Sequence, residues 1–577
     1  MTLPIVRRAL RADTRLSADL HPVLDRVYRA RDINDINELN TSAKALLHYE
    51  QLRDIDKATT LLVDALKTQK KITIVGDFDA DGATSTAVCI LALKQMGFAH
   101  ISYLVPNRFD FGYGLSKQIV DVALQQGAEV IVTVDNGIAC FDGVAHARAL
   151  GLRVIVTDHH LPAPSLPDAD AIVNPNRKDC GFASKSIAGV GVAFYLMLAL
   201  RAKLQREDWF TPSRPAPNLA NLLDIVAVGT VADVVSLDKN NRVLVYQGLQ
   251  RIRSGQCRPG IKALFEVANR NKPLAYLTAT DLGFVIGPRL NAAGRLEDMA
   301  LGIECLLCDD PLQARHMASE LDRLNLQRRA IENEMKEEAE AALASISVEG
   351  ELPPALVLYQ PHFHQGVVGI VAGRLKEKHH RPVIVFANQN EREIKGSARS
   401  IPGLHIRDIL DEVNTAWPGV IDKFGGHAMA AGLSLTRESL PVFEAALHKV
   451  TRRHLNGLDS DKVILSDGEL SADDLALDLA HTLRQAGPFG QGFDAPLFDG
   501  IMDVVDQRMV GENKNHLKLV LRKSNGEEVD AIAFSVDTTV WPSSICKRVQ
   551  VAYRLDINTF RGRESLQLLI EEIEPVE

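Results

Sequence analysis

Short runs of β-branched residues alternate with helix-forming stretches from residue 71 onward, and no other feature of the sequence constrains the fold as strongly. The runs that predict buried strands are 71–75, 101–105, 130–134 and 153–157. The segments 84–96 and 116–126 have the length and composition of helices that cross from one strand to the next. Strands connected in this way pair in parallel, in a sheet that is covered on both faces. The sequence therefore predicts an α/β domain.

Acidic residues follow three of these predicted strands. The acids and the histidines beside them are Asp77, Asp79 and Asp81 after the first strand, Asp135 after the third, and Asp158, His159 and His160 after the fourth. Because the carboxyl ends of parallel strands lie at one edge of a sheet, we expect these side chains to meet. If the first segment stays extended through Asp81, its three carboxylates point to one side, where their repulsion calls for cations.

The residue types in this group indicate a particular metal. Asp233 follows another apolar run and is predicted to join the group. Carboxylates with one or two imidazoles favour Mg²⁺ or Mn²⁺ over the metals that seek thiolates. A pair of such ions can activate a water and stabilise the leaving oxygen of a phosphoester. The group therefore predicts metal-assisted hydrolysis.

Plainer explanations apply to each motif taken alone. An aspartate at a strand end is more often a helix cap than a ligand, and a pair of histidines has little meaning by itself. An EF-hand calcium loop is disfavoured, because residue 88, the twelfth position counted from Asp77, is Val rather than Glu. The delivery of acids by three predicted strands to one edge favours the metal site.

The remaining chain predicts a spacer and two further folded parts. Apolar residues at helical spacing over 309–346 predict one continuous helix about 50 Å long, which looks like a rigid spacer between domains. Pro353 and Pro354 follow it, and the runs 355–359 and 383–386 begin a second α/β unit. After residue 460, short strands separated by turns predict a small antiparallel barrel.

Composition limits the cellular setting. A net charge of −9 and a pI near 6.0 argue against a protein that coats nucleic acid by bulk charge, although a local basic groove remains compatible. The most apolar stretch, 189–200, is shorter than the roughly 20 residues that span a bilayer and predicts a buried helix. Seven cysteines at irregular spacing form no disulfide framework, and the first residues do not resemble a signal peptide. We therefore expect a cytoplasmic protein.

At this point the motifs match a known family. The string DFDADG at 77–82, DNG at 135–137, DHH at 158–160 and Asp233 resemble, in order, the motifs of the DHH phosphoesterase superfamily. The strings GPRLNAAGR at 287–295, HQGVVGIVAGR at 364–374 and GGH at 425–427 are similar to those of its bacterial single-strand-specific 5′→3′ exodeoxyribonucleases. The resemblance covers nearly the whole chain.

The resemblance implies a domain organisation and a set of functional residues. The implied segments are an N-terminal extension packing on the core (1–48), a DHH catalytic domain with a helical part (49–308), a long connecting helix (309–348), a DHH-associated substrate-binding domain (349–458) and an OB-fold-like nucleic-acid-binding barrel (459–577). The implied ligands of two Mg²⁺ or Mn²⁺ ions are Asp77, Asp79, Asp81, Asp135, His159, His160 and Asp233, all but Asp77 also being assigned to catalysis. Asp158 would orient the site from behind.

The resemblance further implies how the substrate is held. The implied DNA-binding residues are Arg108, Tyr113, Arg289, Asn291, Arg295, Gln365, Arg374, Ser397, Arg399 and His427. Among these, Arg108, Ser397 and Arg399 resemble a pocket for a 5′-phosphate, which arginines and backbone amides read well. We expect 287–295 to form a loop that approaches the sugar-phosphate backbone, 366–374 to open a helix, and 425–427 to form a flexible loop. An ordinary surface ion pair is the alternative for each arginine alone.

The expected activity is processive 5′→3′ digestion of single-stranded DNA to 5′-mononucleotides, in recombination, mismatch repair and the processing of stalled forks. The resemblance implies a monomer with single-strand-binding protein and a helicase as partners, and no membrane association. One alternative is another DHH activity on pyrophosphate, short oligonucleotides or cyclic dinucleotides, but those family members are generally shorter and lack the barrel. The other is a non-enzymatic single-strand scaffold, which has no need for clustered carboxylates.

Overall fold

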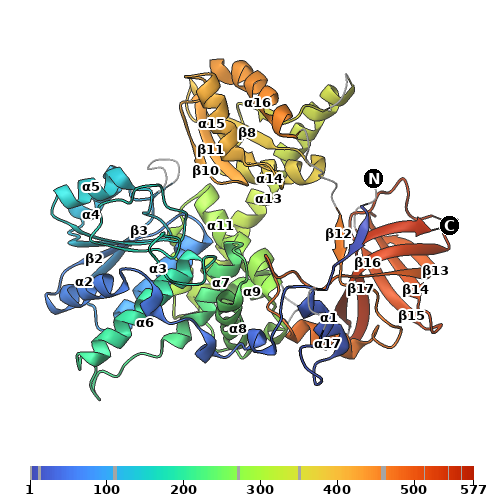
Figure 1. Ribbon diagram of the computed structural model, residues 1–577, viewed down its shortest axis with the longest axis horizontal. Helices are drawn as coiled ribbons and strands as arrows, with labels where there is room; N and C mark the ends of the chain where they lie inside the picture. Colours follow the sequence, from blue (N-terminus) through green and yellow to red (C-terminus); the bar gives the residue numbers. More distant parts are fainter. Residues whose placement is uncertain are drawn as a thin grey trace. The chain divides into compact units, whose positions relative to one another are not determined.

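The chain forms two compact units in the computed structural model (Figure 1). The structure describes residues 3–10, 14–107, 114–268, 273–348, 352–455, 463–511, 514–543, 545–560 and 562–576. The first unit comprises 1–291, 299–319 and 462–577, and the second comprises 292–298 and 320–461. In the described residues, no helix combines the length and the apolar character needed to cross a membrane.

A parallel sheet lies at the centre of the first unit. Its strands are β2 (Ile72–Val75), β3 (Ile101–Leu104), β4 (Val130–Val134), β5 (Arg153–Thr157) and β6 (Ala171–Val173), in the order β3-β2-β4-β5-β6. All neighbouring strands pair in parallel, as the sequence predicts, and β6 is an additional short strand. From β2 the chain crosses to β3 on one side, and β4, β5 and β6 follow on the other side of β2, so the strand order reverses between β2 and β4. Open α/β sheets bind ligands at such a switch point.

Helices cover both faces of this sheet because its strands are apolar on both sides. Helices α4 (Lys117–Gln125) and α5 (Phe141–Ala149) share a core with Ile131, Val154 and Val156. Helices α2 (Ile55–Lys67), α3 (Ala80–Gln95) and α6 (Gly189–Arg206) contact the strands from the other side. The apolar stretch at 189–200 is therefore a buried helix, as the sequence predicts.

A helical part follows the sheet in the first unit. It contains α7 (Leu223–Ala232), α8 (Lys239–Arg253), α9 (Pro259–Ala268), α10 (Ala279–Asp281), a π-helical turn η6 (Leu282–Ile286), the start of α11 (Gly287–Leu296), and α12 (Ala300–Leu307). The residues of α11 from Ala292 onward belong to the second unit. The expectation of a loop at 287–295 is wrong, because these residues form α11. Pro288 directly follows the π-helical turn η6, where its missing N–H removes one hydrogen bond from the helical ladder.

The predicted connecting helix is α13 (Pro311–Val348), whose 38 residues span about 57 Å. Its first residues belong to the first unit and the remainder belongs to the second. Met335, Ala339 and Leu343 pack into a core of the second unit with α14 (Val368–His379). One continuous helix thus contributes to both units.

A mixed sheet forms the second unit, with the order β10-β11-β9-β8-β7. The strands are β7 (Leu356–Tyr359), β8 (Val383–Asn388), β9 (Glu393–Arg399), β10 (Lys423–Gly426) and β11 (Ala430–Thr436). Helices α15 (Ile406–Ala416) and α16 (Leu440–Leu455) share a core with one face of this sheet. The expected flexible loop at 425–427 is wrong in part, because Gly425 and Gly426 pair with Gly432 and Ala431 in a hairpin.

The C-terminal barrel is closed and has the order β13-β14-β15-β17-β16. Its strands are β13 (Phe498–Val510), β14 (His516–Arg522), β15 (Glu528–Ala533), β16 (Arg548–Phe560) and β17 (Arg563–Val576). All neighbouring pairs are antiparallel except β15–β17. A closed barrel with an odd number of strands must contain at least one parallel pair, because directions cannot alternate all the way round.

The N-terminal segment packs against the region that leads into the barrel. Strand β1 (Ile5–Arg7) pairs in parallel with β12 (Ile464–Ser466), and Arg7 forms an ion pair of 2.8 Å with Asp499. After helix α1 (Pro22–Arg29), Arg31 binds both carboxylate oxygens of Asp467 at 2.8 and 2.9 Å. Their side chains are only 2% and 0% exposed. This buried pair fixes the N-terminal segment to the barrel side of the unit.

Candidate metal centre

The first acidic motif lies in the turn between β2 and α3. Asp79 caps α3, because its Oδ1 accepts a hydrogen bond of 3.0 Å from the Gly82 N–H. The expectation of an extended segment through Asp81 is therefore wrong, and Asp81 lies in the first turn of the helix. A side chain at Gly82 would place its Cβ 2.4 Å from the Asp77 carbonyl oxygen, so this turn needs glycine. The motif is compact, with a buried Asp77 and a buried Asp81.

Backbone amides of α6 hold the Asp81 carboxylate. Its two oxygens accept hydrogen bonds of 2.6 Å from the Gly189 N–H and 2.8 Å from the Val190 N–H. A helix N-terminus supplies N–H groups with no partner in the helix and a favourable dipole for a negative charge. Sequence reasoning missed this role. The available signal was Gly189, the glycine at the start of the apolar helix. Glycine fits this position because a Cβ here would lie 2.7 Å from the Cβ of Asp135.

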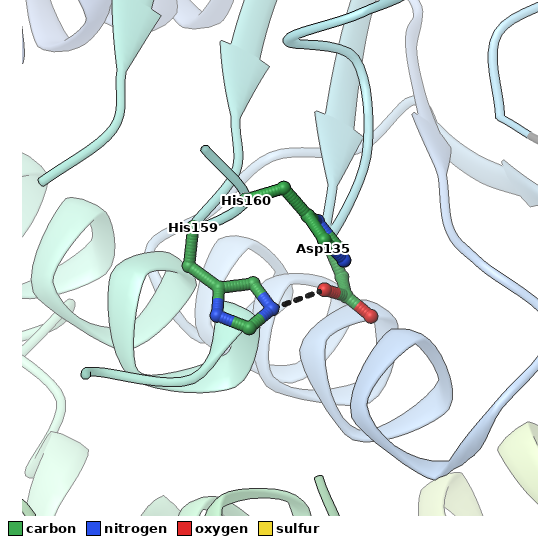
Figure 2. A group of neighbouring side chains, drawn as sticks. All are labelled: Asp135, His159 and His160. Atoms are coloured by element: carbon green, nitrogen blue, oxygen red, sulfur yellow. Dashed lines mark ion pairs between the residues drawn. The ribbon is translucent and has the colours of Figure 1, made fainter. Parts of the chain in front are cut away.

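His159 faces Asp135, and its ring nitrogen pairs with that carboxylate (Figure 2). Its Nε2 is 3.1 Å from Asp135 Oδ1, 3.5 Å from Asp233 Oδ2 and 3.8 Å from Asp81 Oδ2. These carboxylates come from different elements: Asp135 follows β4 in a left-handed conformation, Asp233 ends α7, and Asp81 begins α3. The structure thus brings together acids that are distant in the sequence.

Asp158 supports the two histidines from behind. Its Oδ1 accepts hydrogen bonds from the backbone N–H groups of His159 and His160 at 2.7 and 3.1 Å, and lies 2.7 Å from His160 Nδ1. Its Oδ2 accepts a bond of 2.9 Å from the Ile138 N–H. Asp158 is buried behind the cluster. A carboxylate bound to one ring nitrogen fixes the orientation of an imidazole.

The protonation of the cluster reflects burial and like charge. Burial and the charge of Asp79 raise the pKa of Asp81 to about 7. Burial and neighbouring aspartates, Asp81 foremost, raise the pKa of Asp135 and of Asp233 well above the ordinary range. Burial lowers the pKa of His159 to about 4, so its imidazole is neutral near pH 7. These carboxyl groups ionise with difficulty in the absence of a cation.

His160 differs from His159 in its charge. Burial alone would lower the pKa of His160, but its hydrogen bond to Asp158 and the charge of that carboxylate raise the pKa to about 9. Burial alone would raise the pKa of Asp158, but the hydrogen bond from His160 lowers the pKa of that acid below its usual range. The Asp158–His160 pair is therefore ionic near neutral pH.

The donor set fits hard divalent cations. Three overlapping groups offer ligand atoms that lie within 4.8 Å of one another: Asp77, Asp79 and Asp135; Asp81, His159 and Asp233; and Asp135, His159 and His160. The buried Oδ2 of Asp233 receives no hydrogen bond from any residue that the structure describes. Oxygen ligands with a neutral imidazole match the preferences of Mg²⁺ and Mn²⁺. The arrangement could hold more than one such ion.

Family models match three parts of the chain. The DHH family N-terminal domain matches 71–230, the DHHA1 domain matches 353–453, and the RecJ OB domain matches 466–572. The single-stranded-DNA-specific exonuclease RecJ of Haemophilus influenzae is 52% identical over 563 residues, which cover 97% of each chain. The chain belongs to the RecJ family.

Solved RecJ structures share the fold and hold metal ions. RecJ of Thermus thermophilus in complex with Mn²⁺ is 29% identical and superimposes with a TM-score of 0.80 over 100% of this chain and 79% of that one. The Mg²⁺ complex of the same protein gives a TM-score of 0.74 at 27% identity, over 100% of this chain and 78% of that one. The parallel-sheet DHH domain, the second α/β domain and the OB barrel that the sequence predicts are therefore confirmed.

Three residues that the RecJ resemblance assigns to DNA binding lie on α11. Asn291 Oδ1 accepts a hydrogen bond of 2.8 Å from the Ala80 N–H, between Asp79 and Asp81. Arg289 donates to the Val285 carbonyl oxygen at 2.7 Å, and Arg295 donates to the Gly366 carbonyl oxygen at 3.0 Å. Each of these three side chains therefore forms a hydrogen bond within the unit to which it belongs.

A second group lies at the end of β9 in the second unit. Arg399 donates to Ser397 Oγ at 3.1 Å, and burial lowers the pKa of its guanidinium. Within the described chain, Arg399 forms no ion pair. A Cβ at Gly369, on α14, would lie 3.0 Å from Arg399 Nη2 and 2.9 Å from Ser397 Oγ. The glycine allows the first turn of α14 to approach a partly buried cation that has no carboxylate partner.

The other predicted DNA-binding residues are scattered. Gln365 donates to the Asn388 carbonyl oxygen, and Arg374 forms an ion pair of 3.1 Å with the buried Glu332 of α13. His427 is exposed in the turn after β10. Arg108 and Tyr113 lie outside the described residues.

Proposed function

We propose that the chain is a metal-dependent exonuclease that degrades single-stranded DNA processively from its 5′ end and releases 5′-mononucleotides. The observation that carries this proposal is the convergence of Asp81, Asp135 and Asp233 within 3.8 Å of His159 Nε2. The similarity to RecJ exonucleases supports single-stranded DNA as the substrate. The polarity and the use of two ions are additions that rest on the motif resemblance.

We assign the metal ligands to the residues that the geometry gathers. They are Asp77, Asp79, Asp81, Asp135, His159, His160 and Asp233. Divalent cations bound there would activate a water and stabilise the leaving oxygen of a phosphodiester. The neutral imidazole of His159 offers Nε2 as a ligand without prior loss of a proton. Two of the three ligand groups share no residue, which supports the proposal of two ions.

The protein positions these ligands through fixed contacts. The α6 amides hold Asp81, and Asp158 binds Nδ1 of His160, so a cation would bind Nε2 of that ring after it loses its proton. Burial excludes water from the carboxylates and strengthens their interaction with a cation. These contacts set the geometry before substrate binds, which is the condition for electrostatic catalysis.

Arg399 is assigned to the terminal phosphate. A partly buried guanidinium beside a hydroxyl and the first turn of α14 suits a phosphate group, since arginine forks and helix N-terminal amides both bind anions. Its lack of an ion pair within the described chain leaves its charge available to such a ligand. Ser397 shares this role, and Arg108 and Tyr113 remain predictions from the sequence. Arg289, Asn291, Arg295, Gln365, Arg374 and His427 are proposed to line the path of the strand.

The wider setting follows from the resemblance. We assign residues 1–48, 49–308, 309–348, 349–458 and 459–577 to the extension, DHH domain, connecting helix, DHH-associated domain and OB-fold domain. The protein is proposed to act in the cytoplasm as a monomer, with single-strand-binding protein and a helicase as partners. Recombination, mismatch repair and processing of stalled forks are the expected roles.

One digestion experiment tests the activity. DNA labelled at the 5′ or the 3′ end, single-stranded or duplex, is incubated with Mg²⁺, Mn²⁺ or EDTA. We expect immediate release of the 5′ label from single strands with a divalent cation, slow digestion of duplex, and no release in EDTA. Preferential hydrolysis of a dinucleotide would favour another DHH activity. Binding without hydrolysis under all conditions would favour a scaffold.

Two variants test the centre itself. Asp233→Asn and His159→Ala should each reduce the rate at least 100-fold, because each removes a ligand from the cluster. Asp170→Asn is a matched control, since Asp170 pairs with Arg153 at 2.7 Å at the start of β5 and is not among the cluster residues. Normal turnover by both cluster variants in Mn²⁺ would refute the assignment.

A further inference from the structure

An exposed phenylalanine lies in a turn that packs against α7, the helix that ends at Asp233. Phe284 is 79% exposed, although its neighbours Leu282 and Ile286 are buried. All three belong to η6, the π-helical turn that joins α10 to α11. Single π-turns within helices occur frequently at functional sites. The turn presents a large aromatic ring to solvent while its flanking side chains secure it to the core.

Two glycines bring this turn against the helix that ends at Asp233. A Cβ at Gly283 would lie 3.2 Å from Val231 Cγ1, and one at Gly287 would lie 3.0 Å from the Cβ of Ala232. Val231 and Ala232 form the last turn of α7, and Asp233 is its C-cap. Phe284 is therefore held beside the end of the helix that supplies a carboxylate to the cluster.

Val234, the residue after Asp233, is a second exposed apolar side chain with an unusual backbone. It is 64% exposed and has a φ of +60°. A β-branched residue with positive φ is a steric outlier, and such strain is concentrated at functional sites. Val234 and Phe284 line the same groove, of about 590 Å³, together with Val231, Phe489, Arg8 and Arg554. The groove begins one residue from Asp233.

The charges in this groove are balanced. Arg8 pairs with Asp494 at 2.6 Å, and Arg554 pairs with Glu571 at 2.5 Å. Neither arginine carries a free charge for a phosphate, so a ligand here is recognised mainly by its apolar faces. Nucleobases offer such faces and stack on aromatic side chains in a sequence-tolerant way.

We infer that Phe284 and Val234 form a stacking platform for a nucleobase of single-stranded DNA beside the metal centre. This inference rests on the proposed function, because the ligand is the nuclease substrate. Bases in a duplex are paired and stacked on their neighbours, so their faces are not open to Phe284. The platform thus adds a preference for single strands. Loss of one stacked base is expected to weaken binding about 5- to 100-fold.

The test uses the full-length protein and 5′-phosphorylated oligonucleotides that carry 2-aminopurine at one position at a time. Binding is followed by fluorescence in EDTA, so that no hydrolysis occurs. We expect the wild type to quench the probe at one or two positions, Phe284→Ala to lose this quenching and bind about 5- to 100-fold more weakly, and Phe284→Trp to retain both. Leu312→Ala is the matched control, because Leu312 is 81% exposed in the same unit and lines a different groove.

The outcomes separate this inference from the proposed function. If the wild type releases no nucleotides from single-stranded DNA in Mn²⁺, the proposed function fails and the platform fails with it. If the wild type degrades DNA but Phe284→Ala binds within two-fold and quenches equally, only the platform is overturned. A Phe284→Ala variant with a lower melting temperature but unchanged quenching would show that the ring packs against protein, which also overturns it.

Discussion

Asn291 Oδ1 accepts a hydrogen bond of 2.8 Å from the backbone N–H of Ala80, the residue between Asp79 and Asp81. The bond joins α11 to the turn that carries the first acidic motif. The Ala80 N–H lies in the first turn of α3, where no intrahelical carbonyl can accept it. Asn291 therefore positions the turn from which two proposed ligands project, a role that the resemblance did not imply.

Removal of this amide should weaken metal binding. Asn291→Ala leaves the Ala80 N–H without its acceptor, which destabilises the turn by about 1–3 kcal/mol. We expect Mn²⁺ affinity and turnover to fall about 10- to 100-fold, as for other groups that orient ligands. Asn291→Asp keeps an acceptor oxygen and should bind Mn²⁺ more tightly than Asn291→Ala. Calorimetric titration measures the affinities. Asn221→Ala, which removes an exposed amide contact to Arg251, is the control.

Asp233→Asn should have opposite effects on stability with and without metal. The raised pKa of Asp233 means that its ionisation destabilises the metal-free fold, so a neutral isostere should stabilise that state by about 1–3 kcal/mol in EDTA near pH 7. With Mn²⁺, the wild type gains stability through binding and the variant gains much less. Calorimetric melting in both conditions checks this. Asp170→Asn should instead lower stability in both, because it loses its pair with Arg153.

The Asp158–His160 pair should make stability depend on pH. The pKa of His160 is raised to about 9 from an ordinary value near 6.5, so the folded state binds this proton more tightly than the unfolded state does. Its contribution is fully present below about pH 6.5 and is lost as the pH rises through about 9. In EDTA, the difference in unfolding free energy between the wild type and His160→Gln should therefore shrink between pH 6.5 and 9. A constant difference over that range would contradict the pair's ionic state.

Arg399→Ala should affect DNA ends more than DNA binding. We expect cutting from 5′-phosphorylated strands to slow about 10- to 100-fold, while cutting from 5′-hydroxyl strands and affinity for the rest of the strand change little. The reason is that the guanidinium has no carboxylate partner in the described chain and is available to a phosphate. Competing digestion of the two kinds of end measures the ratio. Arg392→Ala, in the exposed β8–β9 turn, is the control, and an equal loss on both ends would reject the pocket.

Arg31→Ala should destabilise the N-terminal attachment. Removal of Arg31 leaves the buried Asp467 with only the longer contact to Arg8 at 4.0 Å, which costs about 3 kcal/mol. The double variant Arg31→Met, Asp467→Leu should recover much of this loss, since apolar replacement of a buried pair is often neutral. Urea titration followed by circular dichroism compares them. Arg148→Ala, which breaks an exposed pair with Asp168, should shift stability by less than about 1 kcal/mol.

The parts of the structure that follow from local pattern could be predicted from the sequence. The strands β2, β4 and β5 are short apolar runs, and the parallel topology places Asp77, Asp135 and Asp158 at one edge without any further information. The long helix α13 follows from apolar periodicity and from proline residues beyond its end. In each case, the chemistry of neighbouring residues decides the local structure.

The parts that depend on distant contacts could not be predicted. The apolar run and the motif resemblance predict Asp233 as a member of the centre, but the end of α7 that places it there depends on the folded arrangement. The small residues of 287–295 suggested a loop, but Gly287 serves the close packing of α11 on α7. The amide contacts of Asp81 come from residues 108 and 109 positions away. Such contacts are set by the folded arrangement rather than by neighbouring residues.

The pairing of β1 with β12 has a consequence for how the protein is made. Residues 5–7 leave the ribosome early, but their partners at 464–466 and Asp499, which is 492 positions from Arg7, leave it late. At about 5–20 residues per second, the first strand waits roughly 25 to 100 s for its partner. During that interval its backbone edge stays open, so pairing with another nascent chain can precede the native pairing with β12.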